Sequence, residues 1–376
     1  MTTLFIFCFP TLFRPFYDFD ITINQTGFIQ FAVKTHLLTG MKKIKLSILD
    51  QSTISKGNTA INAIKETVQL VQKAEEWGYH RFWMSEHHNL AGIAGSAPEV
   101  LIAHLAAFTK TIRLGAGGIM LPNHSSLKVA ENFRLLETLA PGRIDLGVGR
   151  APGGDRVTAS LLNPSNRFKE EDYIQQVNEL QLYFNDRVQT QFGAVKAIPV
   201  VYDEPPIWML TSSGTSAYIA AEMGLGLAFA QFIAANGVKE AIQAYRESFI
   251  PSDIFQKPEV LIAIWVLCAD TEEKAEELKK SMLHIFLQME KGEVRTGMMP
   301  YSEIKNYLYT DYDRMRMQAN SNRIIAGTPE QVKQAINSLA HTCQADEIMA
   351  AAITYSQEDR FRSFELLAQT FNLQQS

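Results

Sequence analysis

Short apolar runs alternate with longer segments of helical period from residue 44 to the C-terminal end of the chain. Short continuous apolar runs are typical of buried strands, and apolar residues that recur every three or four positions are typical of helices. The predicted strands are residues 44–49, 81–84, 112–118, 143–148, 207–210, 227–230, 260–267 and 347–353. The predicted helices are residues 60–77, 98–108, 127–139, 171–184, 216–223, 238–249, 272–290 and 359–370. Thr328 is the predicted N-cap of a further helix, because Pro329 and Gln331 stand where they favour a helix start.

Strand and helix therefore alternate eight times along the chain. Repeated strand–helix units build a parallel sheet, and eight of them favour a single (β/α)₈ TIM barrel over a doubly wound sheet. We expect an α/β fold in which residues 41–376 form one such domain. Residues 292–323 are rich in Met and Tyr and lack a clear period. They predict an irregular insertion, either a lid over the site or a partly disordered segment.

Residues 1–40 differ from the rest, because they hold eight of the 22 phenylalanines and no glutamate. Pro10 and Pro15 interrupt the apolar stretch and no basic region precedes it, so it does not resemble a signal peptide. It is also too short and broken to cross a bilayer. Our hypothesis is that Met41, followed by two lysines and an apolar run, is the functional start. The alternative is an N-terminal extension packed on the surface.

Composition narrows the class of partner. The 376 residues carry a net charge of −5, without the basic excess of nucleic-acid-binding proteins. The three cysteines are far apart and fit neither a disulfide framework nor a CxxC motif. We therefore expect a cytoplasmic protein that acts on small molecules, with neither nucleic acid nor membrane as a partner.

The active site of a TIM barrel lies at the C-terminal ends of its strands. The second predicted strand runs into Glu86, His87 and His88. A metal site is one interpretation, but neighbouring strand residues point to opposite faces and no third ligand stands nearby. A second is structural, with Glu86 as the partner of histidines at the barrel rim. The third, which we favour, is a catalytic imidazole.

Two further strand ends are rich in glycine. The third ends in Gly115, Gly117 and Gly118, which would let a flat ligand approach the backbone. The fourth leads into residues 147–155, where Pro152 and the spacing argue against a dinucleotide loop. Arg150 in that loop suits a phosphate or the edge of an anionic ring.

The fifth predicted strand runs into six small polar or glycine residues, 211–216, and then directly into a helix. Such a segment supplies backbone N–H groups and a helix dipole for a phosphate, although an ordinary N-cap would look similar. Arg167, in an irregular stretch after the fourth strand, could add charge to the same anion. Together these strand ends predict a flat, phosphorylated cofactor and no metal.

These residues resemble the bacterial luciferase-like flavin monooxygenases, in particular their single-chain group. The segments that carry the resemblance are residues 85–89, 114–123, 141–155 and 346–349. The resemblance implies a (β/α)₈ barrel that binds FMN at the strand C-termini. It also implies that His87 is the catalytic histidine beside the flavin and that Glu86 is the adjacent flavin-site acid.

The same resemblance assigns the cofactor contacts. It implies a non-prolyl cis peptide between Gly117 and Gly118 beneath the flavin ring. It places Arg150 and Arg167 on the phosphate side, and Ser212, Ser213 and Thr215 in the phosphate loop. Two departures concern Gly149 and Ser212, which stand where luciferase has a cysteine and an acid. Neither light emission nor a long-chain aldehyde substrate is therefore predicted.

The expected reaction uses reduced FMN and O₂ on a small organic substrate. No NAD(P)H-binding fingerprint is found in the sequence, so we expect a separate NAD(P)H:flavin reductase as partner. The family also suggests a homodimer. Two alternatives stay open: an NAD(P)H- or deazaflavin-dependent oxidoreductase that transfers a hydride on the same fold, and a flavin-binding protein without catalysis.

Overall fold

The computed structural model describes residues 18–23, 29–34, 44–234, 236–293 and 297–375. The chain divides into two units, Met1–Lys43 and Ile44–Ser376. In the first unit, strands β1 (Asp18–Ile23) and β2 (Ile29–Lys34) pair antiparallel. This hairpin was not predicted from the sequence pattern. The hypothetical start at Met41 lies outside the described residues.

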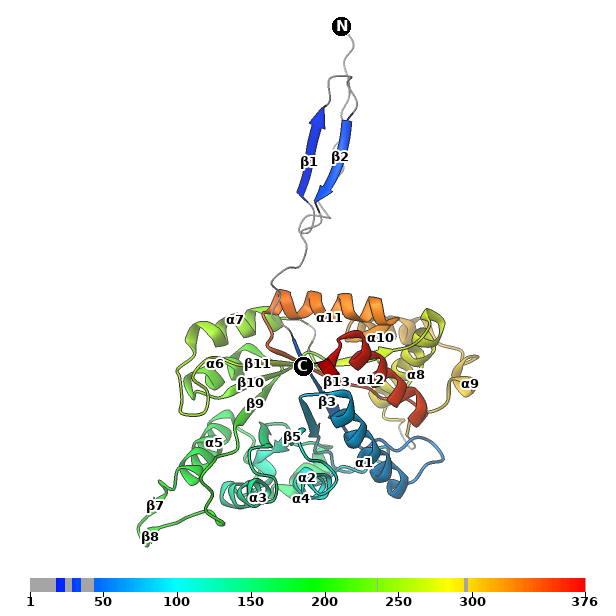
Figure 1. Cartoon of the computed structure of the whole chain (residues 1–376). Coiled ribbons are helices and arrows are strands. Elements are labelled where there is room, and N and C mark those ends of the chain that lie inside the picture. The colour runs from blue at the N-terminus through cyan, green and yellow to red at the C-terminus, as the bar shows by residue number, and fades with distance from the viewer. Residues whose placement is uncertain (1–17, 24–28, 35–43, 235, 294–296, 376) are drawn as a thin grey trace. The chain divides into compact units, whose positions relative to one another are not determined.

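The second unit is the expected barrel, built from eight parallel strands (Figure 1). Its strands are β3 (Lys45–Asp50), β4 (Arg81–Met84), β5 (Arg113–Met120), β6 (Ile144–Gly149), β9 (Ile207–Thr211), β10 (Gly226–Ala230), β11 (Val260–Cys268) and β13 (Glu347–Ala351). The sheet closes because β10 pairs with β9 on one side and with β11 on the other. Each of the eight strands begins and ends within two residues of a predicted strand, so the predicted fold is confirmed.

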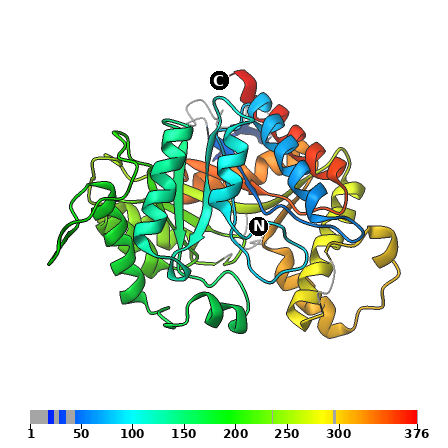
Figure 2. The same ribbon diagram turned by 90° about the horizontal axis from the view of Figure 1, so that it is seen from below.

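Helices cover the outside of the barrel. They are α1 (Ala60–Trp77), α2 (Pro98–Ala106), α3 (Ser126–Leu139), α4 (Arg156–Leu162), α5 (Glu170–Phe184), α6 (Gly214–Glu222), α7 (Val238–Ser248), α8 (Glu272–Lys291), α11 (Pro329–Cys343) and α12 (Gln357–Thr370). Local signals fix their ends. The Thr59 side chain accepts a hydrogen bond from the Asn62 N–H at the start of α1, and Gly78 ends it at φ 85°. Figure 2 shows α1 and α12, the first and last helices of the unit, side by side.

The strands are buried on both faces. All nine residues of β11 and all six of β6 are buried, because helices cover one face and side chains fill the barrel on the other. This burial explains why the strands appear in the sequence as continuous apolar runs. In the barrel core, the rings of Trp83 from β4 and Trp208 from β9 pack edge to face, with centroids 5.9 Å apart.

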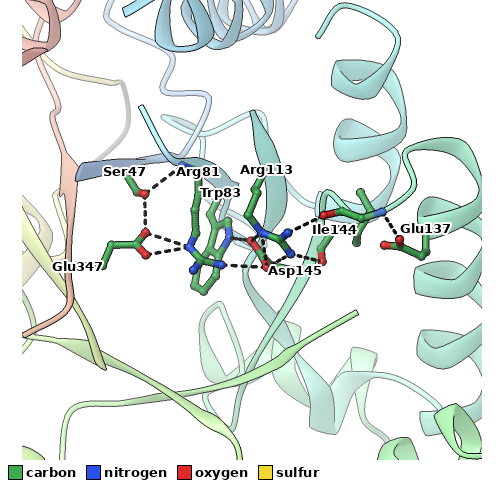
Figure 3. A network of polar contacts seen from close by, with 9 residues as sticks. Ser47, Arg81, Trp83, Arg113, Glu137, Ile144, Asp145 and Glu347 are labelled. Carbon is green, nitrogen blue, oxygen red and sulfur yellow. Dashed lines mark hydrogen bonds and ion pairs between the residues drawn. The ribbon is translucent and has the colours of Figure 1, made fainter. Parts of the chain in front are cut away.

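A network of buried charges joins the N-terminal ends of the strands (Figure 3). Arg81 forms ion pairs of 2.9 Å with Asp145 and with Glu347, and Arg113 approaches Asp145 at 2.7 Å. Trp83 Nε1 donates to Asp145 at 3.1 Å. Burial alone would raise the pKa of Asp145, but the two arginines lower it. The carboxylate is therefore charged and fully paired, and this network was not predicted.

The insertion at residues 292–323 corrects the expectation of an irregular segment. Its described part contains two helices, α9 (Tyr301–Ile304) and α10 (Asp311–Ser321). It leads into β12 (Ile324–Gly327), which pairs in parallel with the C-terminal part of β11. The Lys56 N–H, in the loop after β3, donates to Met298 O at 2.9 Å. The insertion thus packs beside the C-terminal rim of the barrel.

Two small features complete the described part. Strands β7 (Gln189–Thr190) and β8 (Gly193–Ala194) form a short hairpin between α5 and β9. None of the described helices combines the length and the apolar character needed to cross a membrane.

Candidate active site

A cavity of about 910 Å³ opens at the C-terminal ends of the strands. It is lined by residues that follow six strands, drawn from segments 49–51, 85–87, 117–120, 149–168, 210–216 and 230–233. This is the end of the barrel at which the fold places active sites. No described residue of the 292–323 insertion lines it, so the predicted lid is not seen in this conformation.

His87 reaches this cavity from the end of β4. Its Nε2 lies 3.4 Å from Nε2 of Gln51, and its backbone N–H donates to Gly95 O at 3.0 Å. Burial lowers the pKa of His87 below its ordinary value of 6.5. The ring is therefore neutral near neutral pH and able to accept or donate a proton at the cavity wall.

Glu86 also borders the cavity, but its carboxylate is directed into the protein. Its Oε1 lies 2.8 Å from His88 Nε2 and 2.9 Å from His124 Nε2, and its Oε2 accepts the Met120 N–H at 2.8 Å. Burial alone would raise the pKa of Glu86, but these hydrogen bonds lower it. Glu86 is thus the partner of His88 and His124, and no hydrogen bond joins it to His87. His124 was missed, because nothing local marks the turn after β5 as part of the site.

The glycines at the end of β5 bring backbone to the cavity. The peptide between Gly117 and Gly118 is cis, as the resemblance implied. Gly117 lines the cavity and Gly118 does not. A Cβ at Gly117 would lie 2.8 Å from Leu49 Cδ1, and one at Gly118 would lie 2.7 Å from Gly147 O. A side chain at Gly118 would require the backbone to move, and the glycine at position 117 leaves a flat surface on the cavity wall.

The start of α6 forms another wall. Ser212 and Ser213 line the cavity, whereas Thr215 does not and its neighbour Ser216 does. The Ser213 N–H donates to Thr211 Oγ1 at 3.0 Å, which orders the turn before the helix. No side chain caps the first turn of α6. Its N–H groups are therefore available to an anion in the cavity.

The predicted arginines do not all reach the cavity. Arg150 lines it and forms an ion pair of 2.9 Å with Glu170. Arg167 instead lines a separate, smaller cavity of about 340 Å³ beside His124, so the structure does not bring it to the other phosphate-side residues. Arg156, the first residue of α4, does line the main cavity and was not predicted.

One buried polar group lacks a partner. Ser85 lines the cavity and is only 4% exposed, yet its hydroxyl makes no hydrogen bond to the described residues. A buried hydroxyl without a partner is costly, so this hydroxyl is available to hydrogen-bond a molecule in the cavity. Within the described ranges, no three side chains of His, Cys, Asp or Glu are arranged to hold a metal ion.

Residues 44–345 match a protein family described as luciferase-like monooxygenase. The chain belongs to this family. The resemblance seen in its motifs is thereby confirmed. Its named relatives show that the chain is a flavin-dependent oxidoreductase.

Two relatives from Bacillus subtilis (strain 168) indicate the range of the family. The uncharacterized protein YwcH is 46% identical over 330 residues, which is 87% of this chain and 99% of YwcH. An N-acetyl-S-alkylcysteine monooxygenase is 38% identical over 331 residues, which is 86% of this chain and 97% of that protein. The chain is therefore similar over most of its length to at least one relative of named activity.

Solved structures agree on the fold. That of apo-MsnO8 has a TM-score of 0.80 at 32% identity and covers 88% of this chain and 98% of its own. An FMN complex of the oxygenating constituent of 3,6-diketocamphane monooxygenase from Pseudomonas putida has a TM-score of 0.66 at 17% identity, covering 87% and 97%. An F420-dependent secondary alcohol dehydrogenase has a TM-score of 0.64 at 14% identity, covering 88% and 99%. Both of these more distant structures share the barrel fold of this chain.

Proposed function

We propose that this chain is a monooxygenase that uses reduced FMN and O₂ to oxidise a small organic substrate. One observation carries the proposal. A single cavity combines an anion-binding wall at the start of α6 with the flat backbone surface at Gly117 and the imidazole of His87. A phosphate linked to a flat ring system matches both ends of such a cavity.

The residues present fit FMN. A volume of about 910 Å³ is toward the upper end for ligand pockets, about 300–1,000 Å³, so cofactor and substrate can share it. Ser212, Ser213 and Arg150 would hold the phosphate. Gly117 would lie against the flat ring, and the unpaired hydroxyl of Ser85 offers a hydrogen bond. Thr215 and Arg167 would act only after rearrangement, because neither lines the cavity.

Bound reduced FMN supplies the two electrons with which one atom of O₂ enters the substrate and the other leaves as water. The chain provides the surroundings. Neutral His87 can hold or transfer a proton at Nε2 on the cavity wall. Leu49, Met120 and Phe232 are apolar parts of the lining that exclude water from the reacting atoms.

The source of electrons and the assembly state belong to the same proposal. We expect a separate NAD(P)H:flavin reductase to deliver reduced FMN. Exposed apolar side chains on α2 and α3 favour a homodimer through these adjacent helices. They are Val100 on α2 and Leu135 and Leu139 on α3. Sedimentation velocity at several concentrations would show the dimer and its loss when Leu135 and Leu139 are changed to Glu.

An anaerobic titration with FMN, riboflavin and F420, each oxidised and reduced, tests the cofactor. Preferential binding of reduced FMN, followed by rapid oxidation when O₂ is mixed in, would support the monooxygenase. F420 is included because an F420-dependent secondary alcohol dehydrogenase has the same fold. Preference for reduced F420, with no reaction toward O₂, would instead indicate hydride transfer, and binding without turnover would indicate a flavin carrier.

His87 has its own test. We expect His87→Ala to keep FMN affinity within about threefold, since no charged contact is lost, while the oxidation of bound reduced FMN changes at least about tenfold. An unchanged rate and an unchanged dependence on pH would remove His87 from the reaction.

A further inference from the structure

We propose that the buried carboxylate of Glu86 and the partly buried rings of His88 and His124 form a positioning cluster that fixes the cavity wall on which the cofactor ring lies. The inference rests on the proposed function for its consequence, but the cluster itself is a property of the ligand-free chain. It assigns roles to two histidines outside the catalytic pair predicted from the sequence, and it moves Glu86 from catalysis to positioning.

The geometry of the carboxylate carries the first step. The Glu86 side chain is fully buried, and its oxygens meet three polar partners at 2.8–2.9 Å, namely His88, His124 and the Met120 N–H. A buried carboxylate that accepts this many hydrogen bonds is already fully engaged. It is therefore not free to exchange protons with a ligand in the cavity.

The hydrogen positions follow from this arrangement. An ionised carboxylate only accepts hydrogen bonds, so His88 and His124 must both carry a proton on Nε2. Burial alone would lower the pKa of His124, but Glu86, assisted by Glu99, raises it above 6.5. The other charged groups beside His124 are Arg167, Asp172 and Glu179, which share its small cavity. A charge-assisted contact between Glu86 and His124 results.

The cluster joins the ends of neighbouring strands. Glu86 and His88 follow β4, and Met120 and His124 lie at the end of β5. The backbone N–H of His88 donates to Gly153 O at 2.8 Å, which brings in the loop after β6. Gly154 is held as closely, because a Cβ there would lie 2.9 Å from His88 O. Three of the segments that line the cavity are thus tied to one carboxylate.

His87 is positioned by the same contacts. It stands between Glu86 and His88, and successive residues of extended chain point to opposite sides. With both neighbours held in the protein interior, the ring of His87 is directed to the cavity. Met120 and Gly117 lie on the same wall, so the cluster holds the proposed ring surface and the imidazole in one geometry.

The first experiment needs no cofactor. In protein labelled with ¹⁵N-histidine, H88Q and H124Q assign two of the eight imidazoles. We expect both rings to carry Nε2–H, and His124 to titrate above 6.5 in the wild type. In E86Q, His124 should titrate lower, because burial then acts without the carboxylate. A His124 that titrates identically with and without the Glu86 charge would overturn the cluster.

The second experiment asks whether the cluster acts on the site. H124Q keeps a side-chain N–H that can reach Glu86, whereas H124L has a similar volume and no donor. We expect H124L to weaken FMN binding about tenfold and to alter the visible spectrum of the bound FMN, and H124Q to remain within about twofold of the wild type. H341L and H341Q, on an exposed histidine of α11, are the matched controls.

Thermal unfolding separates positioning from general loss of structure. If H124L and H124Q bind FMN equally well, or lose binding only in proportion to folded protein, the positioning role is wrong. If the wild type binds no FMN, the proposed function fails instead. The histidine titration of the ligand-free chain would then still decide whether the cluster exists.

Discussion

At the scale of single residues, His80 shows how the buried charge network affects its neighbours. It stands directly before β4, next to Arg81. Burial is the largest influence and lowers its pKa, Arg81 and Lys45 act in the same direction, and Glu347 and Asp145 oppose them, so that the pKa is about 4. As the pH falls below 6.5, the unfolded chain therefore begins to protonate this ring while the folded chain still keeps it neutral.

This shift predicts an acid sensitivity. Because the folded-state pKa lies below the ordinary 6.5, the unfolded chain binds the proton preferentially as the pH falls. The contribution of His80 to stability is present above pH 6.5 and is lost as the pH falls toward 4. We expect the stability advantage of the wild type over H80Q to shrink by about 1–2 kcal/mol across this window, after allowing for partial exposure. Urea unfolding at both ends of the window measures it, and a constant difference would contradict it.

The residues show how far sequence reasoning reaches. His87 could be identified because it belongs to a compact motif at a strand end, where the fold fixes position. The side-chain direction of Arg167 could not be predicted, because it lies in an irregular stretch: its neighbours Asn166 and Phe168 line the main cavity, while Arg167 lines the smaller one. His124 escaped notice because its role depends on a contact with Glu86, which lies 38 positions away.

At the scale of elements, the loop after β6 and the start of α5 set the state of Arg150. Its guanidinium pairs with Glu170 while both side chains remain largely exposed. An exposed ion pair contributes little to stability, so the arginine can change partner when an anion binds.

This exchange predicts opposite effects of two substitutions. R150Q should weaken FMN binding about tenfold or more, because a charge-assisted contact to the phosphate is lost, and should leave riboflavin binding unchanged. E170Q should bind FMN at least as tightly as the wild type, since it frees the guanidinium. Fluorescence titrations with both flavins measure the effects. Equal weakening of both flavins in R150Q would show that Arg150 does not contact the phosphate.

The contact between β5 and β6 predicts a sharp packing limit. A Cβ at Gly147 would lie 2.2 Å from Ala116 O and 2.8 Å from Leu210 Cδ1, so backbone must move to admit it. We expect G147A to lower the free energy of unfolding by at least about 2 kcal/mol. Gly214, with nothing near its Cβ position, is the control, and G214A should change stability by less than about 0.5 kcal/mol. Chemical denaturation measures the free energy of unfolding of both variants. A loss in G147A alone would support the packing limit, and equal losses in G147A and G214A would contradict it.

Elements were predictable where burial gives them a strong pattern. The eight barrel strands and the long helices appear in the sequence because one environment acts on many consecutive residues. Strand β12 was missed, since its four residues pair only with β11 and are partly exposed. Helices α9 and α10 were missed because their sequences are largely polar and short, so tertiary contacts rather than a periodic pattern define them.

At the scale of the whole molecule, the Arg81 network links strands that are far apart in the sequence. Glu347 begins the last barrel strand and Arg81 begins the second, and the two residues are 266 positions apart in the sequence. The ion pair is buried on both sides, at 4% and 3% exposure. The ion pair therefore ties the second barrel strand, β4, to the last one, β13, and so contributes to closing the barrel.

We expect E347Q to lower the free energy of unfolding by about 3 kcal/mol, because it leaves part of the buried Arg81 charge uncompensated. E365Q, which removes an exposed pair with Arg362, should cost less than about 1 kcal/mol. Thermal and urea unfolding measure both variants. Similar losses in the two would show that the burial of the Arg81 pair has no special effect on closure.

The cavity wall at residues 149–168 has an evolutionary consequence. This one contiguous stretch supplies more of the lining than any other segment, while the proposed phosphate contacts at Ser212 and Ser213 come from elsewhere in the chain. After Gly149, the last residue of β6, the stretch lies outside the hydrogen-bonded strands and leads through α4 to α5. A single recombination event that exchanged residues 151–168 would therefore replace much of the cavity lining and leave Arg150, Ser212 and Ser213 in place, so a descendant could acquire a new substrate and keep the same cofactor.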